Sequence, residues 1–366
     1  MATTKRTPFV PREAHHPGIT LGEKLEELGM SVKEFAIRTS KPEKTINAIL
    51  KGSSSITSDM AVAFENVTAI PARFWMQKQQ NYNEYLSRLM RERLLNSSVA
   101  WSKYFPIAAM TALGWLPKVR SAIEKVDALF RFFAVSSVSA WEDYYYNQQL
   151  KVAFRISLSQ TKNPHAISAW LRQGELQAQS MHIATSYSPE LLRKKLVEMR
   201  ALVLDDSNDM PLKLQQICSE CGIKLVFTKC LPKAPISGST RWIQNEPCVQ
   251  LSGRYKSHDR FWFTFFHEIG HILLHGKKAI FLEDIDYNGN EAEKEQEADA
   301  FATETLIEQR MFNAFVANDD FSKASIKSFA NDCGTSPSIV VGRLQHIGKL
   351  RFDVHNELKR NIELPY

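Results

Sequence analysis

The feature that most constrains this chain is an H-E-x-x-H motif at residues 267–271, within an aromatic stretch at 259–275 that reads as one helix. Residues four apart on an α-helix lie only about 40° apart around its axis. The imidazoles of His267 and His271 therefore project from one face and can reach one cation. Glu268, about 100° further round the helix, stands beside that cation without ligating it. The motif predicts a metal site with a carboxylate next to it that is not a ligand.

The ligand types indicate which ion such a site holds and what it lacks. Two imidazoles favour Zn²⁺ among common cellular metals, with Mn²⁺ as the alternative. A catalytic zinc keeps one position open for water, so one more protein ligand is needed. In the acidic segment 291–302, Glu297 borders the inward face because it lies four residues before Phe301. Glu295 projects from a different side. We therefore predict Glu297 as the third ligand, with Glu293 as the alternative one turn earlier.

This combination of residues is typical of zinc metallopeptidases. Zinc would polarise its bound water and the scissile carbonyl, while Glu268 takes the proton of the water and returns it to the leaving amine. We expect an enzyme that hydrolyses peptide bonds without a covalent intermediate. Tyr255, His258 and Arg260 lie just upstream of the motif. Spacing alone does not show which of them, if any, stabilises the negative charge that develops on the carbonyl oxygen during hydrolysis. His275, one turn further along the helix, is expected to support the site from outside the ligand set or to be structural.

Apolar spacing along the rest of the chain predicts a helix-dominated α+β fold. Residues 19–90 have the pattern of short helices joined by tight turns, and residues 99–189 continue the helical pattern with many aromatic residues. The period then changes. Residues 223–227, 241–244 and 248–251 are predicted strands, and the last two form a hairpin directly before the H-E-x-x-H helix.

Composition sets limits on the class of protein. The chain has 366 residues, enough for roughly two or three domains, and a net charge of only +6, so charge alone does not predict a nucleic-acid binder. No stretch approaches the roughly 18 uninterrupted apolar residues of a membrane span, and the N-terminus lacks the apolar region of a secretory signal. Five cysteines, an odd number, fit a reducing compartment better than a disulfide framework. We expect a cytoplasmic protein that does not bind a membrane.

Residues from about 220 to 310 resemble the ImmA/IrrE family of bacterial metallo-endopeptidases. The resemblance rests on three short stretches, namely Arg260-Phe261, His267-Glu268-Ile269-Gly270-His271 and Glu297-Ala298-Asp299-Ala300-Phe301-Ala302. It implies a small gluzincin-like fold with a short antiparallel sheet, and metal ligands at His267, His271 and Glu297. Members of this family tend to cut a specific repressor or partner, and several govern phage, mobile-element or stress responses.

The N-terminal part resembles the Xre/HigA-type helix-turn-helix antitoxins. The matching stretches are His16-Pro17-Gly18, residues 31–52, residues 56–61 and Phe74-Trp75. The resemblance implies a first helix at 31–36, a turn at 39–41 and a recognition helix at 42–50. It also implies a set of DNA contacts, in which Lys41, Lys44, Thr45 and Asn47 face the DNA and Lys33 and Lys51 lie near phosphates.

These patterns together predict the domains. They are a disordered tail at 1–14, an Xre/HigA-like helix-turn-helix domain at 15–95, a helical middle domain at 96–190, an ImmA/IrrE-like metallopeptidase domain at 191–310, and a helical segment at 311–366 packed on the peptidase.

The leading functional hypothesis is a DNA-associated, zinc-dependent, site-specific endopeptidase that regulates transcription. Its expected partners are a protein substrate (a repressor, an antitoxin or the chain itself) and a double-stranded DNA operator, bound as a homodimer. The expected settings are phage defence, mobile-element control, toxin-antitoxin regulation and stress response. The alternative is a HigA-like DNA-binding antitoxin or repressor whose metal domain is a sensor or scaffold without essential proteolysis.

Overall fold

The computed structural model describes residues 14–150, 163–276, 281–282 and 290–366, with the side chains of 147–150, 281–282 and 290–291 left out. It divides into two compact units, Met1–Ser97 and Ser98–Tyr366. The predicted tail at 1–14 lies outside the described residues except for its last residue. The predicted middle domain, peptidase domain and C-terminal segment all fall within the second unit, apart from residues 96 and 97.

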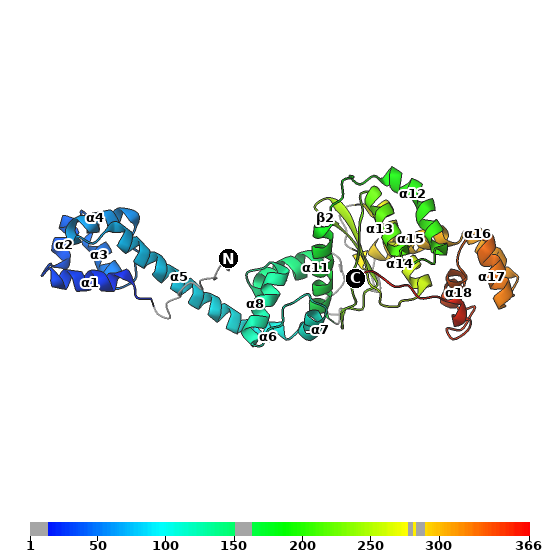
Figure 1. Ribbon diagram of the computed structural model, residues 1–366, viewed down its shortest axis with the longest axis horizontal. Coiled ribbons are helices and arrows are strands. Elements are labelled where there is room, and N and C mark those ends of the chain that lie inside the picture. The colour runs from blue at the N-terminus through cyan, green and yellow to red at the C-terminus, as the bar shows by residue number, and fades with distance from the viewer. Residues whose placement is uncertain (1–13, 151–162, 277–280, 283–289) are drawn as a thin grey trace, which may run out of the picture. The chain divides into compact units, whose positions relative to one another are not determined.

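The first unit is a bundle of helices (Figure 1). They are α1 (Pro17–Glu27), α2 (Val32–Arg38), α3 (Glu43–Leu50), α4 (Ser58–Thr68) and α5 (Ala72–Ser97). The side chains of Ser31 and Thr57 accept hydrogen bonds from backbone N–H groups in the first turns of α2 and α4, which fixes where these helices begin. Buried Phe35, Phe64 and Trp75 form the aromatic centre of the core. The order α2, turn, α3 agrees with the predicted helix-turn-helix segment.

The second unit begins with a group of helices around an aromatic cluster. They are α6 (Val99–Ser102), α7 (Ile107–Ala112), α8 (Ala122–Phe133), α9 (Val138–Trp141), a π-helical stretch η1 (Glu142–Leu150) and α11 (Pro164–Ser180). The indole of Trp141 lies 5.6 Å from the ring centroids of both Trp101 and Phe105 and 6.1 Å from that of Phe133. These aromatic residues are buried, so they form a core and not a surface for stacking bases.

The rest of the second unit combines a small sheet with helices. In chain order its elements are α12 (Pro189–Ala201), η2 (Leu202–Leu204), α13 (Met210–Glu220), β1 (Lys224–Phe227), β2 (Gly238–Ile243), β3 (Glu246–Leu251), α14 (His258–His275), β4 (Phe281–Leu282), α15 (Asn290–Leu306), α16 (Gln309–Ala317), α17 (Lys323–Asp332), α18 (Pro337–His346) and η3 (Asn356–Leu358). Among the described residues, no helix is long and apolar enough to cross a membrane.

The strands form one sheet in the order β1-β3-β2-β4. The predicted hairpin is confirmed as β2 and β3, which turn at Gln244 and Asn245, both with positive φ. The resemblance implied an antiparallel sheet, but the sheet is mixed. The reason is that the chain reverses twice between β1 and β3, once before β2 and once at the hairpin, so β3 runs parallel to β1. The fold class is α+β, as predicted.

Each face of the sheet packs against a different helix. Leu225 and Phe227 of β1 belong to the core that they share with the aromatic residues of α14, whereas Val226 points the other way and packs with Ala178 of α11. This alternation is the expected period of two along a strand. Helix α14 is therefore held against one face of the sheet, while the middle helices cover the other.

The C-terminal helices complete the support of α14. Close approach of α18 to α14 depends on Gly342, because a Cβ there would lie 2.3 Å from a carboxylate oxygen of Asp259. The chain then returns to the start of α14, where the N–H of Ile362 donates to the carbonyl of Lys256 at 2.8 Å and the N–H of His258 donates to the carbonyl of Arg360 at 3.0 Å. Residues 360–362 thus form one wall beside the N-terminal end of α14.

Candidate metal centre

Helix α14 presents the H-E-x-x-H residues from inside the protein. Its aromatic face, including Trp262 and Phe266, is buried in the core, and the hydroxyl of Thr240 on β2 donates to the backbone carbonyl of Glu268 at 3.0 Å. His267 and His271 are 3% and 1% exposed. Their Nε2 atoms lie 2.9 Å apart, so both rings point to one place, as the helical spacing predicts.

The third side chain at this place is that of Glu295 on α15. One of its carboxylate oxygens lies 3.1 Å from Nε2 of His267, and the other lies 3.5 Å from Nε2 of His271. Ligand atoms of these three residues all lie within 4.8 Å of one another. Among the described residues this is the one group of His, Cys, Asp or Glu side chains arranged to hold a metal ion.

The structure differs here from the predicted third ligand, Glu297. The Glu297 side chain is 64% exposed, and its Oε2 lies 2.9 Å from Nε2 of His275. The prediction takes Ala298, Phe301, Ala302 and Thr305 as the inward face and selects Glu297 by its spacing from Phe301. Phe301 is only partly buried, whereas Ala298 and Ala302 are fully buried. Those two alanines, three and seven residues after Glu295, define the stripe of α15 that meets α14.

Small residues bring the two helices together at the centre. A Cβ on Gly270 would lie 3.3 Å from Cα of Ala298 and 3.1 Å from Cδ1 of Phe301, which is tighter than most real contacts. The glycine of H-E-x-G-H therefore lets α15 approach α14 closely. This approach carries the Glu295 side chain to the two histidines. Glu293, the alternative ligand from the sequence, is exposed and does not belong to the cluster.

The outer nitrogen of each histidine also has a partner. Nδ1 of His267 lies 2.8 Å from Oδ1 of Asp299, which shares a helix face with Glu295 because it lies four residues later. Nδ1 of His271 lies 3.0 Å from Nδ1 of His275, whose Nε2 contacts Glu297. If each Nδ1–H of the two motif histidines donates outward, their Nε2 lone pairs both face the centre.

The electrostatics of the three inner residues suit a cation. Burial lowers the pKa of His271 to about 4, so its imidazole is neutral near pH 7. Burial alone would raise the pKa of Glu295, but its contacts with the imidazoles of His267 and His271 lower it to about 2. Two imidazole nitrogens and one carboxylate thus converge on a single point. Lone pairs that face one another at 2.9 Å are stabilised by a positive charge between them, and this donor set fits Zn²⁺.

Glu268 is fully buried beside this cluster. Its carboxylate lies against the first residue of β2, since a Cβ on Gly238 would lie 2.4 Å from Oε1 of Glu268 and 2.7 Å from Cγ2 of Thr264. The glycine leaves room for the carboxylate between α14 and the sheet. The sequence analysis did not single out Gly238. A glycine at the start of a strand before the motif helix is the signal that could have identified it.

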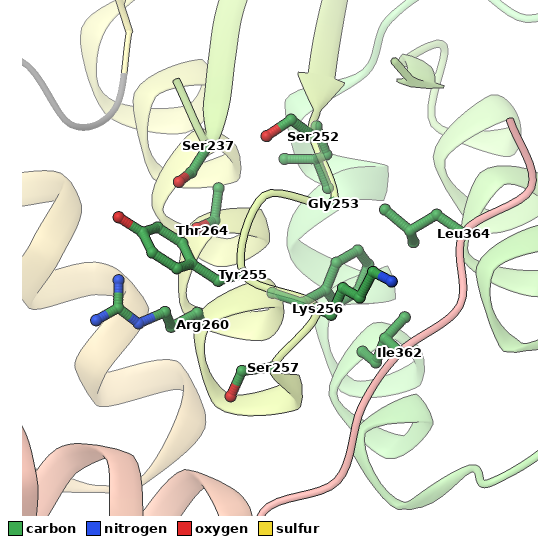
Figure 2. Close-up of a pocket in the computed structure, with 12 residues that line it drawn as sticks. Ser237, Ser252, Gly253, Tyr255, Lys256, Ser257, Arg260, Thr264, Ile362 and Leu364 are labelled. Carbon is green, nitrogen blue, oxygen red and sulfur yellow. The ribbon is translucent and has the colours of Figure 1, made fainter. Parts of the chain in front are cut away.

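The three upstream residues that were candidates to stabilise the oxyanion lie in two different environments. His258 is buried and faces away, because Nε2 of its ring contacts the carbonyl of Val203 and the indole N–H of Trp262, both at 3.1 Å. Tyr255 and Arg260 stack on each other instead, with the guanidinium carbon 3.9 Å from the ring centroid. Both line a surface pocket along the N-terminal half of α14 (Figure 2).

The predicted DNA-contacting residues all lie on α2, on α3 or directly beside them. Lys33, Lys44 and Lys51 are exposed, whereas Thr45 and Asn47 are half-buried on α3. Lys41, in the turn between the two helices, forms an ion pair with Asp59 in the first turn of α4. That pairing neutralises one of the charges that the sequence assigns to DNA.

A family model now identifies the class of domain that the H-E-x-G-H helix, the small sheet and α15 form. Residues 218–345 match the Peptidase_M78 family, described as the IrrE N-terminal-like domain. The chain therefore contains a domain of this family, which confirms the resemblance found over residues 220–310.

Comparisons with whole proteins add two solved structures. One is an addiction module antidote protein of the HigA family from Coxiella burnetii, with 28% identity, which covers 23% of this chain and 94% of that chain at a TM-score of 0.22. The other is a candidate antidote protein of a plasmid maintenance system from Nostoc punctiforme, with 23% identity, covering 22% of this chain and 89% of that chain at a TM-score of 0.22. No curated protein matches the chain.

Proposed function

We propose that this protein is a zinc-dependent endopeptidase whose ion is held by His267, His271 and Glu295. The observation that carries the proposal is the convergence of their ligand atoms within 4.8 Å, beside a buried glutamate that is not one of them. The match to a peptidase family supports the same reading. Mn²⁺ is the alternative ion, because nitrogen and carboxylate ligands also bind it.

The chain's own residues then have distinct tasks. When bound, the zinc ion supplies the charge that polarises a water molecule and the scissile carbonyl. Glu268 accepts the proton of that water on its carboxylate and passes it to the amine that leaves. Asp299 and His275 hold the two imidazoles in the orientation that aims Nε2 at the centre.

The first unit would tether this activity to DNA. In α3 and its flanks, Lys44 and Lys51 are exposed, and Asn47 is half-buried on the same helix. Such residues suit phosphate and base contacts in a helix-turn-helix protein. The proposed substrate is a repressor or antitoxin, or the chain itself, and the proposed outcome is a change in transcription. A homodimer on two half-sites and a cytoplasmic location complete the proposal.

One substitution tests the enzymatic half. Glu268→Gln removes the base but keeps the shape and all three ligands, so we expect metal content to stay and cleavage of the protein substrate to fall by about 10²- to 10⁴-fold. If the biological effect persists at full strength in this variant, the alternative holds, in which the metal domain is a sensor or scaffold of a HigA-like repressor.

A second experiment tests the DNA half. Changing Lys41, Lys44 and Asn47 to Ala together should remove specific operator binding in an electrophoretic mobility assay, since these residues are assigned to the DNA side of α3 and its turn. Unchanged, salt-sensitive binding would show that another surface contacts the DNA.

A further inference from the structure

A surface pocket adjoins the buried glutamate of the metal centre. Thr264, which lies one helical turn before Glu268 on α14, lines this pocket together with Ser237. Ser237 immediately precedes Gly238, the residue against which the Glu268 carboxylate lies. The wall formed by Ser237 and Thr264 is therefore shared between the pocket and the catalytic carboxylate.

The opposite wall comes from the end of the chain. Ile362 and Leu364 line it, and the backbone hydrogen bond from Ile362 to Lys256 holds this segment beside the loop before α14. Figure 2 shows Tyr255 and Arg260 on the same side as Ser237 and Thr264, across from Ile362 and Leu364. The pocket thus has an apolar side and a polar side.

The pocket carries positive charge. Lys256 and Arg260 are the charged residues among those that line the pocket in the described part of the chain, and both are exposed. The Arg260 guanidinium stacks on the ring of Tyr255 at 3.9 Å, which orients it while its N–H groups stay available to a ligand. Arg254, whose guanidinium carbon lies 4.8 Å from the same ring centroid and whose Nη1 donates to the carbonyl of Pro235, adds to the positive field.

We infer that this pocket binds an acidic side chain of the protein substrate, and that Arg260 is the residue that selects it. The inference rests on the proposed function, because the pocket is assigned to a substrate through its shared wall with Glu268. A carboxylate suits the site, since a guanidinium can form two parallel hydrogen bonds to it. The carbon stem of a Glu or Asp side chain would lie against Ile362 and Leu364.

The test measures binding, so that it does not depend on cleavage. The probes are two fluorescent peptide pools of identical random design, except that one contains Glu wherever the other contains Gln. They are titrated against the zinc-loaded full chain carrying Glu268→Gln, and fluorescence anisotropy is recorded. We expect the Glu pool to bind about three- to fivefold more tightly, the range of an exposed ion pair.

Substitutions at Arg260 assign the preference. Arg260→Ala should remove it, and Arg260→Glu should turn it in favour of the Gln pool. The matched controls are Arg310→Ala and Arg310→Glu on α16, an exposed arginine that does not line the pocket, and they should leave the preference intact. Equal binding of the two pools, or equal effects at Arg260 and Arg310, would overturn the inference.

Cleavage by the wild-type chain separates this inference from the proposed function. If the chain cleaves no protein but the Arg260-dependent preference is present, the proposed function fails and the pocket assignment stands. If it cleaves peptides of both pools equally well, with cut sites mapped by mass spectrometry showing no acidic residue at a fixed distance, the pocket assignment fails and the proposed function stands.

Discussion

The metal centre and the helix-turn-helix surface place their candidate residues in opposite environments. His267 and His271 are almost fully buried, and both ring nitrogens of each lie within 3.0 Å of a side chain from α14 or α15. Lys33, Lys44 and Lys51 are exposed on separate turns of the first unit. A buried, mutually bonded set depends on every member, whereas exposed charges act nearly independently and are screened by salt. Single substitutions should therefore abolish the first site and only weaken the second.

The largest effect should come from removing a ligand. His271→Ala deletes one of the two imidazoles of the centre and leaves the Glu295 carboxylate without part of its support. We expect the affinity for Zn²⁺ to fall by more than about 100-fold, beyond the 10- to 100-fold loss usual for residues that only orient ligands. Competition with a fluorescent zinc chelator measures this. His182→Ala, at an exposed position outside the cluster, serves as the control, and an equal loss there would contradict the assignment.

A smaller effect should follow from widening the contact between the two helices. Gly270→Ala places a methyl group 3.3 Å from Cα of Ala298, so α15 must move by a few tenths of an ångström and Glu295 with it. We expect about a 10-fold loss of Zn²⁺ affinity in the same assay. The control is Gly22→Ala on α1, where the added Cβ meets only Cδ2 of Leu50 at 3.7 Å. Unchanged affinity in Gly270→Ala would mean that the close approach is not needed to place Glu295.

The smallest effects belong to the helix-turn-helix surface. Lys51→Ala removes one exposed charge near α3, so operator binding should weaken severalfold and the slope of log K against log salt should fall by about one. Lys41→Ala should change the slope less, because Lys41 is already paired with Asp59. Fluorescence anisotropy at several salt concentrations measures both slopes. A larger change for Lys41 than for Lys51 would contradict the contrast between the two lysines.

Sequence predicted the parts of the fold that depend on local pattern. The H-E-x-x-H helix, the hairpin of β2 and β3 and the α2–turn–α3 segment follow from period, turn chemistry and capping, which act within a few residues. The pairing of β1 with β3 depends on how the chain passes through β2, and local pattern does not contain that information. The sheet was therefore expected to be antiparallel, and it is mixed.

In the metal site, too, local pattern predicted one part and the packing of distant segments decided the other. Helical phase placed His267 and His271 together, since both lie on one helix. The third residue depends on how α15 crosses α14, and phase within α15 does not fix that crossing. The fully buried Ala298 and Ala302 mark the contact stripe, and Glu295 lies on it. Ala298 and Phe301 both meet Gly270, so the crossing of the two helices, and not the phase of α15 alone, selects Glu295.

The most direct test of the account compares two glutamates on one helix. Zinc per chain is measured by inductively coupled plasma mass spectrometry after dialysis against a weak chelator, for wild type, Glu295→Gln and Glu297→Gln. Both substitutions are isosteric, each removes one negative charge, and they lie two residues apart on α15. We predict one zinc in the wild type, its loss in Glu295→Gln and its retention in Glu297→Gln. Retention in Glu295→Gln with loss in Glu297→Gln would contradict the centre described by the structure.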